Sequence, residues 1–497
     1  MLYLKFTLPI FLFLSLFPEN TLDTSLAIKG EHEKLSPLDF SNKLKEIHES
    51  EGLEGSVMSV FVMEASESKP LTDYYSQLGM ATASTMKAIT TAAGMRVLGK
   101  DFTFKTRVEY DGEIDENGTL QGNLYIRGGG DPTLGKDNLP ALLERITDKV
   151  RDSGINQING CVVGDARIFD RQLTPDTWIW EDMGNYFGAG ASGLSINENL
   201  YRLYFKTGSR EGTATQITGM EPKIPGVEFV NEITTGKPGS GDNGYIFGAP
   251  YTYLRYVRGS LPPNYPSFMI KGSMPDPAYF CAYELQRYIE ARGIEVNRSA
   301  TTFRLSKEIK EGPCKVIWSK ESPTLDRIIT RTNMKSVNLY AEAILRMIGH
   351  VKKNEGSTSA GIEAMYELWE SEGIDMKGCH FADGSGLSRF NAVNARQMVQ
   401  ILQTMLRYDT DGSYIKSLPI AGKTGTLKNM CKGRLSEGRI RAKSGYINRV
   451  RSYAGYADSI TGKRLVFAIM INNYSKPYGQ LTHDFEDIMD MIVRLGR

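Results

Sequence analysis

Strand-forming segments stand near both ends of the 497-residue chain, and they constrain its fold more than any other feature. Residues 56–64 are apolar and β-branched, and an extended pattern resumes over residues 74–79 after a polar turn that contains Pro70. Near the other end, residues 451–457 and 465–472 form a predicted hairpin. Segments from both ends bury their apolar faces most simply when they pair in one sheet.

Helical spacing dominates the later middle of the chain and the segment that follows the first strands. Apolar residues recur there at intervals of three and four, which places one face of each segment in a core. The predicted helices are residues 84–98, 324–333, 337–348, 361–372, 395–407 and 484–495. We therefore expect an α+β fold in which helices cover an antiparallel sheet.

Residues 102–304 follow a different pattern, in which short apolar strands alternate with Gly, Asn, Asp and Pro. This pattern predicts a β-rich inserted region, which we expect to form two subdomains. The flanking residues 28–101 and 305–497 then make up the domain that contains the sheet. No repeat of fixed period suggests a solenoid or a propeller.

The charge balance excludes one large class of partner. Lys and Arg total 59 and Asp and Glu total 58, so the formal net charge is +1. No long-range field favours nucleic acid, and we expect none as a partner.

The first residues predict export. Lys5 precedes an apolar run over residues 6–17, and Ser25 and Ala27 are small residues suited to a cleavage site. The run is shorter than the roughly 20 residues of a membrane helix. We expect a signal peptide over residues 1–27, cleaved near Ala27, and a mature protein in the periplasm or the cell envelope; an uncleaved anchor is the alternative.

Cysteine and histidine spacing predicts no metal site and no cofactor. The five cysteines stand singly, none lies in a Cys-x-x-Cys pair, and the sequence leaves open whether any of them pair. The five histidines include no His-x-x-x-His pair, so each is expected at the surface or packed in a core.

Ser84 and Lys87 form the motif that carries the chemistry. Three residues apart on a helix, their hydroxyl and amine share a face and come within hydrogen-bonding reach. A partly desolvated lysine, kept neutral by cationic neighbours, can take the proton of a serine and make it a nucleophile. Ser66 and Lys69 match the same spacing, but Pro70 and polar neighbours indicate a hairpin turn there.

Two further elements complete a candidate site. Ser336 and Asn338 open a predicted helix; the serine can relay a proton to a leaving amine, and the amide can bind the substrate backbone. Lys443 stands just before the terminal hairpin, where it can attract a carboxylate and lower the pKa of Lys87.

Residues after Lys443 are expected to bind substrate. Ser444 can bind a terminal carboxylate, and a strand edge that starts at Gly445 permits close approach of a peptide. The backbone amides of Ser84 and Tyr446 are the predicted oxyanion hole. Two competing matches, Lys423-Thr-Gly and Ser195-Ile-Asn, lie in a basic turn and in the β-rich region, so we do not assign them to the site.

With these elements, the sequence resembles the low-molecular-mass penicillin-binding proteins that act as D-alanyl-D-alanine carboxypeptidases and endopeptidases, of the type with a large insertion between the Ser-x-x-Lys and Ser-x-Asn elements. The segments that carry the resemblance are residues 122–134 (GNLYIRGGGDPTL), 163–169 (VGDARIF), 189–199 (AGASGLSINEN), 383–389 (DGSGLSR) and 425–427 (GTL). In such proteins the last of these precedes the third element, which favours Lys443. Val337 and Ser444 depart from the common Asp and Thr without removing a reactive group.

The resemblance implies a penicilloyl-serine transferase fold, peptidoglycan stem peptides as substrate, an acyl-enzyme on Ser84, and β-lactams as covalent inhibitors. A sensor or scaffold that binds peptidoglycan or β-lactams with little turnover is the alternative. A β-lactamase is disfavoured because no separate deacylating Glu is identifiable. We expect Asp383 and Arg389 to form a turn with an ion pair. The balance of carboxypeptidase and endopeptidase activity, the diamino acid of the stem peptide, the ligand of the inserted region and a homo-oligomer stay open.

Overall fold

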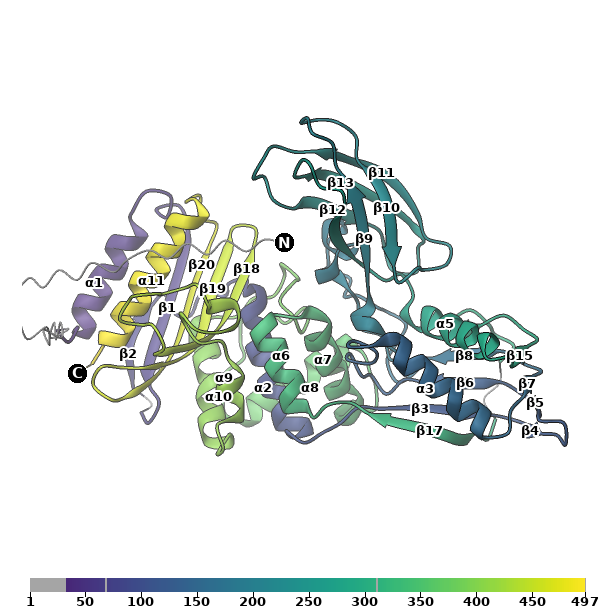
Figure 1. Cartoon of the computed structure of the whole chain (residues 1–497). Helices are drawn as coiled ribbons and strands as arrows, with labels where there is room; N and C mark the ends of the chain where they lie inside the picture. The colour runs from purple at the N-terminus through teal and green to yellow at the C-terminus, as the bar shows by residue number, and fades with distance from the viewer. Residues whose placement is uncertain (1–32, 68, 310–311, 497) are drawn as a thin grey trace, which may run out of the picture.

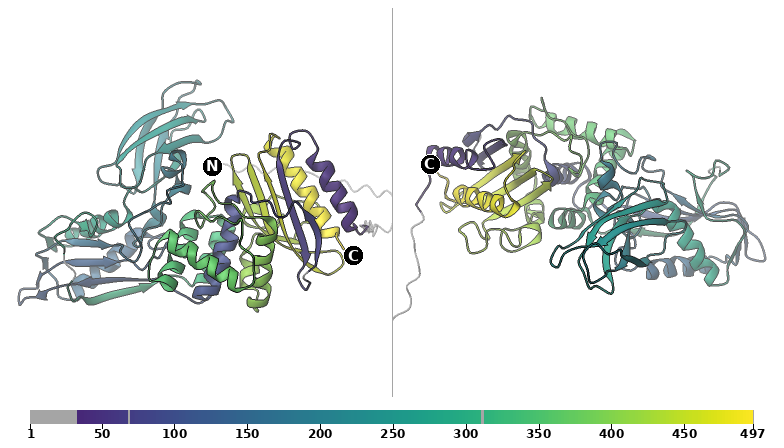
Figure 2. Two further views of the ribbon diagram at one scale, coloured as in Figure 1. Left: turned by 180° about the vertical axis from the view of Figure 1, so that it is seen from behind. Right: turned by 90° about the horizontal axis from the view of Figure 1, so that it is seen from above.

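The structure, a computed structural model, describes residues 33–67, 69–309 and 312–496. The predicted signal peptide lies outside these residues. A helix-covered sheet forms one end of the molecule, and the β-rich inserted region extends away from it (Figure 1). Figure 2 shows the same elongated arrangement from behind and from above.

One antiparallel sheet joins strands from both ends of the chain, in the order β18-β19-β20-β1-β2. Its strands are β1 (Val57–Glu64), β2 (Pro70–Tyr74), β18 (Ile440–Ile447), β19 (Val450–Asp458) and β20 (Arg464–Asn472). The second strand therefore starts at Pro70, where the sequence predicts a turn. A proline fits there because it is the first residue of an edge strand and donates no ladder hydrogen bond.

Both faces of this sheet are buried, as the alternation along β1 shows. Val60 and Val62 pack on one face, in a core with Phe40 and Phe485. Phe61 and Met63 pack on the other face. Because successive side chains point to opposite faces, a strand covered on both sides is apolar at almost every position.

Helices cover both faces of the sheet. α1 and α11 pack on the first face, and α2 and α9 on the second, with the remaining helices behind them (Figure 1). Their bounds are α1 (Pro37–His48), α2 (Met86–Leu98), α6 (Leu325–Lys335), α7 (Asn338–Lys353), α8 (Thr358–Ser371), α9 (Ala395–Tyr408), α10 (Ser413–Ser417) and α11 (Tyr478–Arg494).

The first part of the inserted region is a five-stranded mixed sheet, ordered β16-β8-β6-β3-β17, with a smaller sheet, ordered β15-β7-β5-β4, beside it. The bounds are β3 (Lys105–Tyr110), β4 (Glu113–Ile114), β5 (Thr119–Gln121), β6 (Leu124–Arg127), α3 (Leu139–Asp152), β7 (Gln157–Ile158), β8 (Val162–Asp165), α5 (Pro277–Ala291), β15 (Glu295–Val296), β16 (Thr301–Thr302) and β17 (Lys315–Glu321). Parallel pairing of β8 with β6 and β16 makes this sheet unlike the antiparallel sheet at the ends of the chain.

The second part consists of two three-stranded sheets, β10-β9-β14 and β11-β13-β12, which stand apart from the first part in Figure 1. Short helices precede it. The bounds are α4 (Trp180–Met183), β9 (Leu200–Lys206), β10 (Gln216–Glu221), β11 (Glu228–Thr235), β12 (Asn243–Phe247), β13 (Leu254–Leu261) and β14 (Phe268–Ser273).

β17 follows residue 304, the predicted end of the inserted region. β17 pairs antiparallel with β3, so its residues belong to the sheet of the inserted region rather than to the flanking domain. This strand is mostly exposed and lies at the sheet edge, and its apolar run covers only residues 316–318, shorter than the roughly 4–8 residues that predict a strand. We propose a division with the inserted region over residues 102–321, and we call residues 33–101 and 322–496 the transferase region.

None of the helices within the described residues combines the length and apolar composition needed to cross a membrane.

Candidate active site

Ser84 and Lys87 lie where the first part of the chain turns into α2. Ser84 belongs to a short 3₁₀ turn over Ala83–Thr85 and does not cap the helix, and Lys87 is in the first turn of α2. The Lys87 Nζ donates to the Ser84 Oγ at 2.9 Å. The amine and the hydroxyl are therefore already in contact.

Lys87 is completely buried and has three hydrogen-bond acceptors. Besides Ser84, its Nζ donates to the Asn338 Oδ1 at 2.5 Å and to the Ser385 carbonyl at 2.6 Å. An ammonium has three N–H donors, so each has an acceptor. On losing a proton, the amine gains a lone pair that can accept the hydroxyl proton of Ser84.

Burial is the main cause of the unusual acidity of Lys87. It lowers the pKa of Lys87 to about 7, while the carboxylates of Asp383 and Glu342 oppose this by raising it. The predicted desolvation of Lys87 is thus its main cause, whereas the predicted effect of cationic neighbours on Lys87 is wrong. The repulsion between Lys87 and Lys443 instead acts on Lys443: burial is the largest cause of its lowered pKa, and the charge of Lys87 is the second.

The second element lies between α6 and α7. Ser336 adopts a left-handed conformation (φ 56°) between the two helices, and its Oγ accepts from the Lys443 Nζ at 3.0 Å. Asn338 opens α7; its Nδ2 donates to the Phe187 carbonyl at 2.7 Å. One amide thus links Lys87 to the inserted region.

The third element lies within β18, the edge strand of the sheet, which precedes the hairpin of β19 and β20 in the chain. Lys443 is buried, and the Ser444 Oγ shares a 2.7 Å hydrogen bond with the Thr426 Oγ1. A side chain at Gly445 would place its Cβ 2.6 Å from the Thr82 carbonyl oxygen and 3.0 Å from the Ser84 nitrogen. Glycine therefore allows this strand to lie against the turn that carries Ser84.

These three elements border one cleft with a volume of about 580 Å³. Ser84, Ser336, Asn338 and Tyr446 line it, and the Tyr446 side chain is exposed at its rim. The inserted region supplies Glu181, Asp182, Tyr186, Phe187 and Tyr245 to the opposite wall. The cleft therefore belongs to both regions of the molecule.

Asp182 and Arg389 bring opposite charges to this cleft. Burial raises the pKa of Asp182 to about 6, and Arg389 opposes that shift. Arg389 forms no ion pair with Asp383 within the part of the chain that the structure describes, so the expected pairing of Asp383 with Arg389 is wrong.

Asp383 instead organises the loop beside Lys87. It accepts from the backbone N–H groups of Gly386 at 2.7 Å and Ser388 at 2.6 Å, and from the Trp178 Nε1 at 2.9 Å. Trp178 of the inserted region therefore contacts a loop of the transferase region directly. The residues fit the predicted turn, but the partners of this carboxylate are backbone amides and an indole.

Sequence reasoning missed Glu342, which lies one turn after Asn338 on α7. Glu342 is buried and accepts from the backbone N–H of Ser385 at 2.8 Å and of Gly384 at 3.1 Å. Burial, followed by the charge of Asp383, raises its pKa. Its position four residues after Asn338 is the signal that could have identified it.

The competing matches lie elsewhere. Lys423 is exposed and pairs with Glu437 at 2.5 Å. Ser195 is buried in the inserted region, where its Oγ donates to the Ser192 carbonyl and accepts from the Asn199 Nδ2. Ser66 lies in the connection between β1 and β2. None of these three residues lines the cleft that the described residues form.

Metal ligands are not gathered here. Within residues 33–67, 69–309 and 312–496, no group of three or more His, Cys, Asp or Glu is placed to hold a metal ion. All five cysteines are described, and each is a free thiol.

Comparison with known proteins gives consistent matches over almost the whole chain. A sequence model of the D-Ala-D-Ala carboxypeptidase 3 (S13) family matches residues 40–495. The chain is 29% identical over 446 residues to a D-alanyl-D-alanine carboxypeptidase from Actinomadura sp. strain R39, covering 87% of this chain and 80% of the relative. It is 26% identical over 435 residues to D-alanyl-D-alanine carboxypeptidase DacB from Haemophilus influenzae, covering 85% of this chain and 86% of the relative.

A solved structure supports the same fold. The crystal structure of penicillin binding protein 4 from Haemophilus influenzae superposes with a TM-score of 0.78 at 23% identity, covering 90% of this chain and 97% of that chain. The expected α+β fold of the penicilloyl-serine transferase type is confirmed.

Proposed function

Because this chain belongs to the D-Ala-D-Ala carboxypeptidase 3 (S13) family, we propose that Ser84 is the residue with which it attacks peptidoglycan stem peptides. The protein is a serine-type D-Ala-D-Ala carboxypeptidase of the penicillin-binding type. Its reaction removes the last D-alanine of a stem peptide, and the roles of individual residues follow from the cleft.

The contact between Lys87 and Ser84 carries this proposal. An amine with a pKa of about 7 is half neutral at neutral pH, and it lies 2.9 Å from the hydroxyl that must lose a proton. Neutral Lys87 takes the proton of Ser84, and the Ser84 Oγ attacks the carbonyl of the penultimate D-alanine.

Neighbouring groups stabilise the developing oxyanion and protonate the leaving amine. The backbone N–H groups of Ser84 and Tyr446 stabilise the negative oxygen. Ser336 donates its proton to the nitrogen of the departing D-alanine and recovers a proton from Lys443 or Lys87. Water then attacks the ester on Ser84, with Lys87 again as the base.

The edge strand β18 and its side chains hold the substrate. An edge strand offers unpaired backbone groups, and an extended peptide can pair with them. Lys443 and Ser444 bind the terminal carboxylate, with Thr426 orienting the Ser444 hydroxyl. Ser444 keeps the hydroxyl that threonine has in related proteins, so its substitution leaves this role intact. The Asn338 amide binds the peptide backbone.

The wall from the inserted region favours a substrate larger than a dipeptide. Asp182, Tyr186 and Tyr245 face the cleft from outside the transferase region. They are placed to contact the part of a stem peptide that precedes its two D-alanines. A cross-linked peptide enters from the same side, so the cleft also suits endopeptidase cleavage.

Covalent labelling tests the assignment of Ser84. Full-length protein incubated with a labelled penicillin is expected to carry the label on Ser84, as found by peptide mass mapping. Ser84→Ala is expected to take up none. Equal labelling of the variant, or no labelling of the native protein, would show that another residue reacts.

Turnover distinguishes the enzyme from a sensor or scaffold that acylates and then stays acylated. A short peptide ending in D-Ala-D-Ala is expected to release many equivalents of D-alanine per protein molecule. Release of a single equivalent would favour the sensor instead.

The family acts on the cell wall, and we propose that this chain reaches it through the export signal predicted over residues 1–27. N-terminal sequencing of protein recovered from cells tests the cleavage expected near Ala27. A first residue at Met1 would instead indicate an uncleaved anchor.

A further inference from the structure

A second cavity lies where the inserted region meets α7. Its volume is about 630 Å³, close to that of the catalytic cleft, and none of the described residues lines both. It is bordered by residues 102–105, by the ends of β6 and β8, and by Met347, His350 and Val351 of α7. Met347 and His350 follow Asn338 by nine and twelve residues on one helix, which is roughly 14–18 Å along its axis.

Cations gather on one wall of this second cavity. Lys105, Arg107, Arg127 and Arg167 line it, with Asp165 as the one carboxylate among the described lining residues. Arg127 contacts Asp165 at 2.6 Å and Glu109 at 2.9 Å. Counting both carboxylates against the four cations leaves a formal excess of two positive charges.

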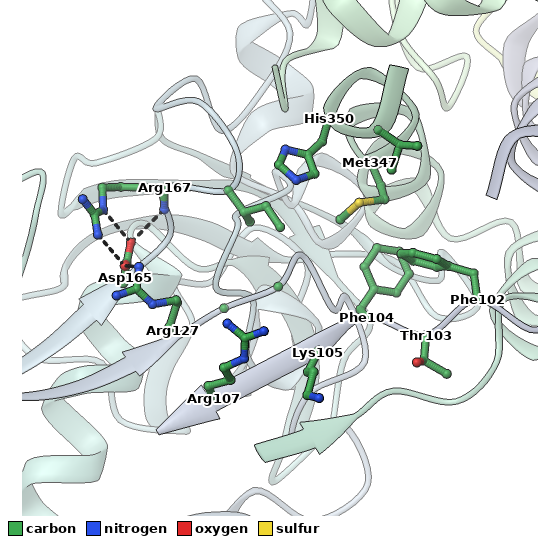
Figure 3. Close-up of a pocket in the computed structure, with 14 residues that line it drawn as sticks. Phe102, Thr103, Phe104, Lys105, Arg107, Arg127, Asp165, Arg167, Met347 and His350 are labelled. Atoms are coloured by element: carbon green, nitrogen blue, oxygen red, sulfur yellow. Dashed lines mark hydrogen bonds and ion pairs between the residues drawn. The ribbon is translucent and has the colours of Figure 1, made fainter. Parts of the chain in front are cut away.

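The opposite wall is apolar. Figure 3 shows Phe104 and Met347 on the side away from Arg167, with His350 above them and Lys105 below Phe104, beside Arg107. Phe102, Ile168 and Val351 add further apolar surface. A ligand that fills this space therefore combines an anionic group with aliphatic groups.

The cationic wall is held in shape by close backbone packing and ion pairs. A Cβ on Gly129 would lie 2.2 Å from the Lys105 carbonyl oxygen, so only glycine lets these segments touch. Arg167 pairs with Asp165 at 2.9 Å and lies 3.6 Å over the Phe303 ring. Groups that are already positioned lose little freedom when a ligand binds.

We propose that this second cavity binds a carboxylate-bearing stem peptide of peptidoglycan, separate from the one in the catalytic cleft. The inference rests on the proposed function, because the wall polymer presents many stem peptides with terminal carboxylates beside aliphatic alanine side chains. A carboxylate suits the modest charge excess, and the methyl groups suit the apolar wall. The Asp165 carboxylate within the wall disfavours the dianion of phosphate.

Two stem peptides held at once would strengthen binding to the polymer without changing chemistry in the cleft. The second contact forms within an existing complex, so its effective concentration is high. A short peptide cannot occupy both sites and gains nothing from the second cavity.

Calorimetry with a soluble disaccharide-tetrapeptide tests the proposal directly. This probe ends in a single D-alanine and is a product, not a substrate, of the carboxypeptidase. It is titrated into full-length protein whose cleft is closed by covalent penicillin. The variant is Lys105→Glu with Arg107→Glu, both exposed; the matched control is Lys206→Glu with Lys237→Glu, two exposed lysines outside the cavity.

The cavity variant is expected to bind the probe roughly tenfold more weakly than the native protein, with the control unchanged. Equal affinity in the two variants would overturn the proposal. So would binding of inorganic phosphate with no binding of the tetrapeptide probe, since that result assigns the cavity to phosphate. Matching melting temperatures establish that both variants are folded.

Activity measurements on two substrates distinguish a failure of the second binding site from a failure of the proposed function. On intact peptidoglycan the cavity variant is expected to lose kcat/KM several-fold, and on a short D-Ala-D-Ala peptide to keep it. An equal loss on both substrates would overturn a separate binding site. If the native protein releases no D-alanine and takes up no penicillin, the proposed function fails; the titration on unmodified protein then still decides whether the cavity binds the probe.

Discussion

The catalytic cleft and the second cavity lie against the same two regions and have similar volumes, yet they use cations in opposite ways. Lys87 and Lys443 of the cleft have no exposed surface, whereas Lys105 and Arg107 of the cavity reach solvent. Burial removes the water that stabilises a charge, so the pKa of a buried amine falls and the amine can act as a base. An exposed cation stays charged and attracts anions. Access to water therefore separates Lys87, which can act as a base, from Lys105 and Arg107, which stay charged and can bind anions.

The sharpest test of this comparison replaces a lysine by arginine in each place. A guanidinium does not lose its proton in proteins, so Lys87→Arg is expected to lower penicillin acylation by about 10²–10⁴-fold. Lys105→Arg keeps the charge and is expected to change acylation less than about twofold. Stopped-flow or labelling kinetics measure both. Comparable losses in the two variants would break the distinction between base and binding cation.

Lys443 and Lys423 offer a second comparison, because Lys443 is buried beside Ser336 and Lys423 is exposed in a turn. Lys443→Ala removes a preorganised donor beside Ser336, and acylation is expected to fall by roughly 100-fold. Lys423→Ala should retain most of the acylation. A reversed order would assign the third element to Lys423.

The pH dependence of acylation reports the protonation of Lys87. Because its pKa is lowered to about 7, the neutral fraction falls about tenfold per pH unit below that value and levels off above it. Acylation measured from pH 5 to 9 is therefore expected to rise to a plateau near pH 8. The charges of Asp383, Glu342 and Lys443 all interact with the Lys87 amine. A flat profile would mean that these charges keep the amine in one protonation state over the whole pH range.

Glu342→Gln is expected to have the smallest effect, a displacement of this profile. The Glu342 carboxylate raises the pKa of Lys87, so its neutralisation lowers that pKa and moves the profile to lower pH by less than about one unit. Glu363→Gln, an exposed carboxylate on α8, is the control and should leave the profile in place. An unmoved profile in Glu342→Gln, with only lower protein stability, would show a purely structural role.

Local pattern predicted much of the fold. Four helices of the later middle begin and end within five residues of their predicted bounds, because their apolar spacing indicates a face in the core. The predictions were poorer for strands whose residues are exposed or atypical. β17 carries few buried side chains, and β2 starts at a proline.

The candidate site likewise has one part that the sequence predicts and another that it does not. Ser84 and Lys87 are three residues apart, so helix geometry alone brings them together. The other acceptors of Lys87 are not local: the Ser385 carbonyl lies 298 residues further along the chain. Sequence spacing contains no measure of such contacts, nor of the burial that sets the pKa of Lys87. The pair was therefore found from the sequence, but the low pKa of Lys87 was assigned in part to cationic neighbours, whereas burial is its main cause.

The bond from the Asn338 amide to the Phe187 carbonyl limits how far this protein can be shortened. Phe187 belongs to the inserted region, and the other end of the same amide accepts from Lys87. A truncated version that joins residue 101 directly to residue 322 would leave the Asn338 Nδ2 without its acceptor and open one side of the cleft to solvent. Engineering a minimal enzyme from the transferase region would thus have to rebuild a partner for that amide before any gain from smaller size could appear.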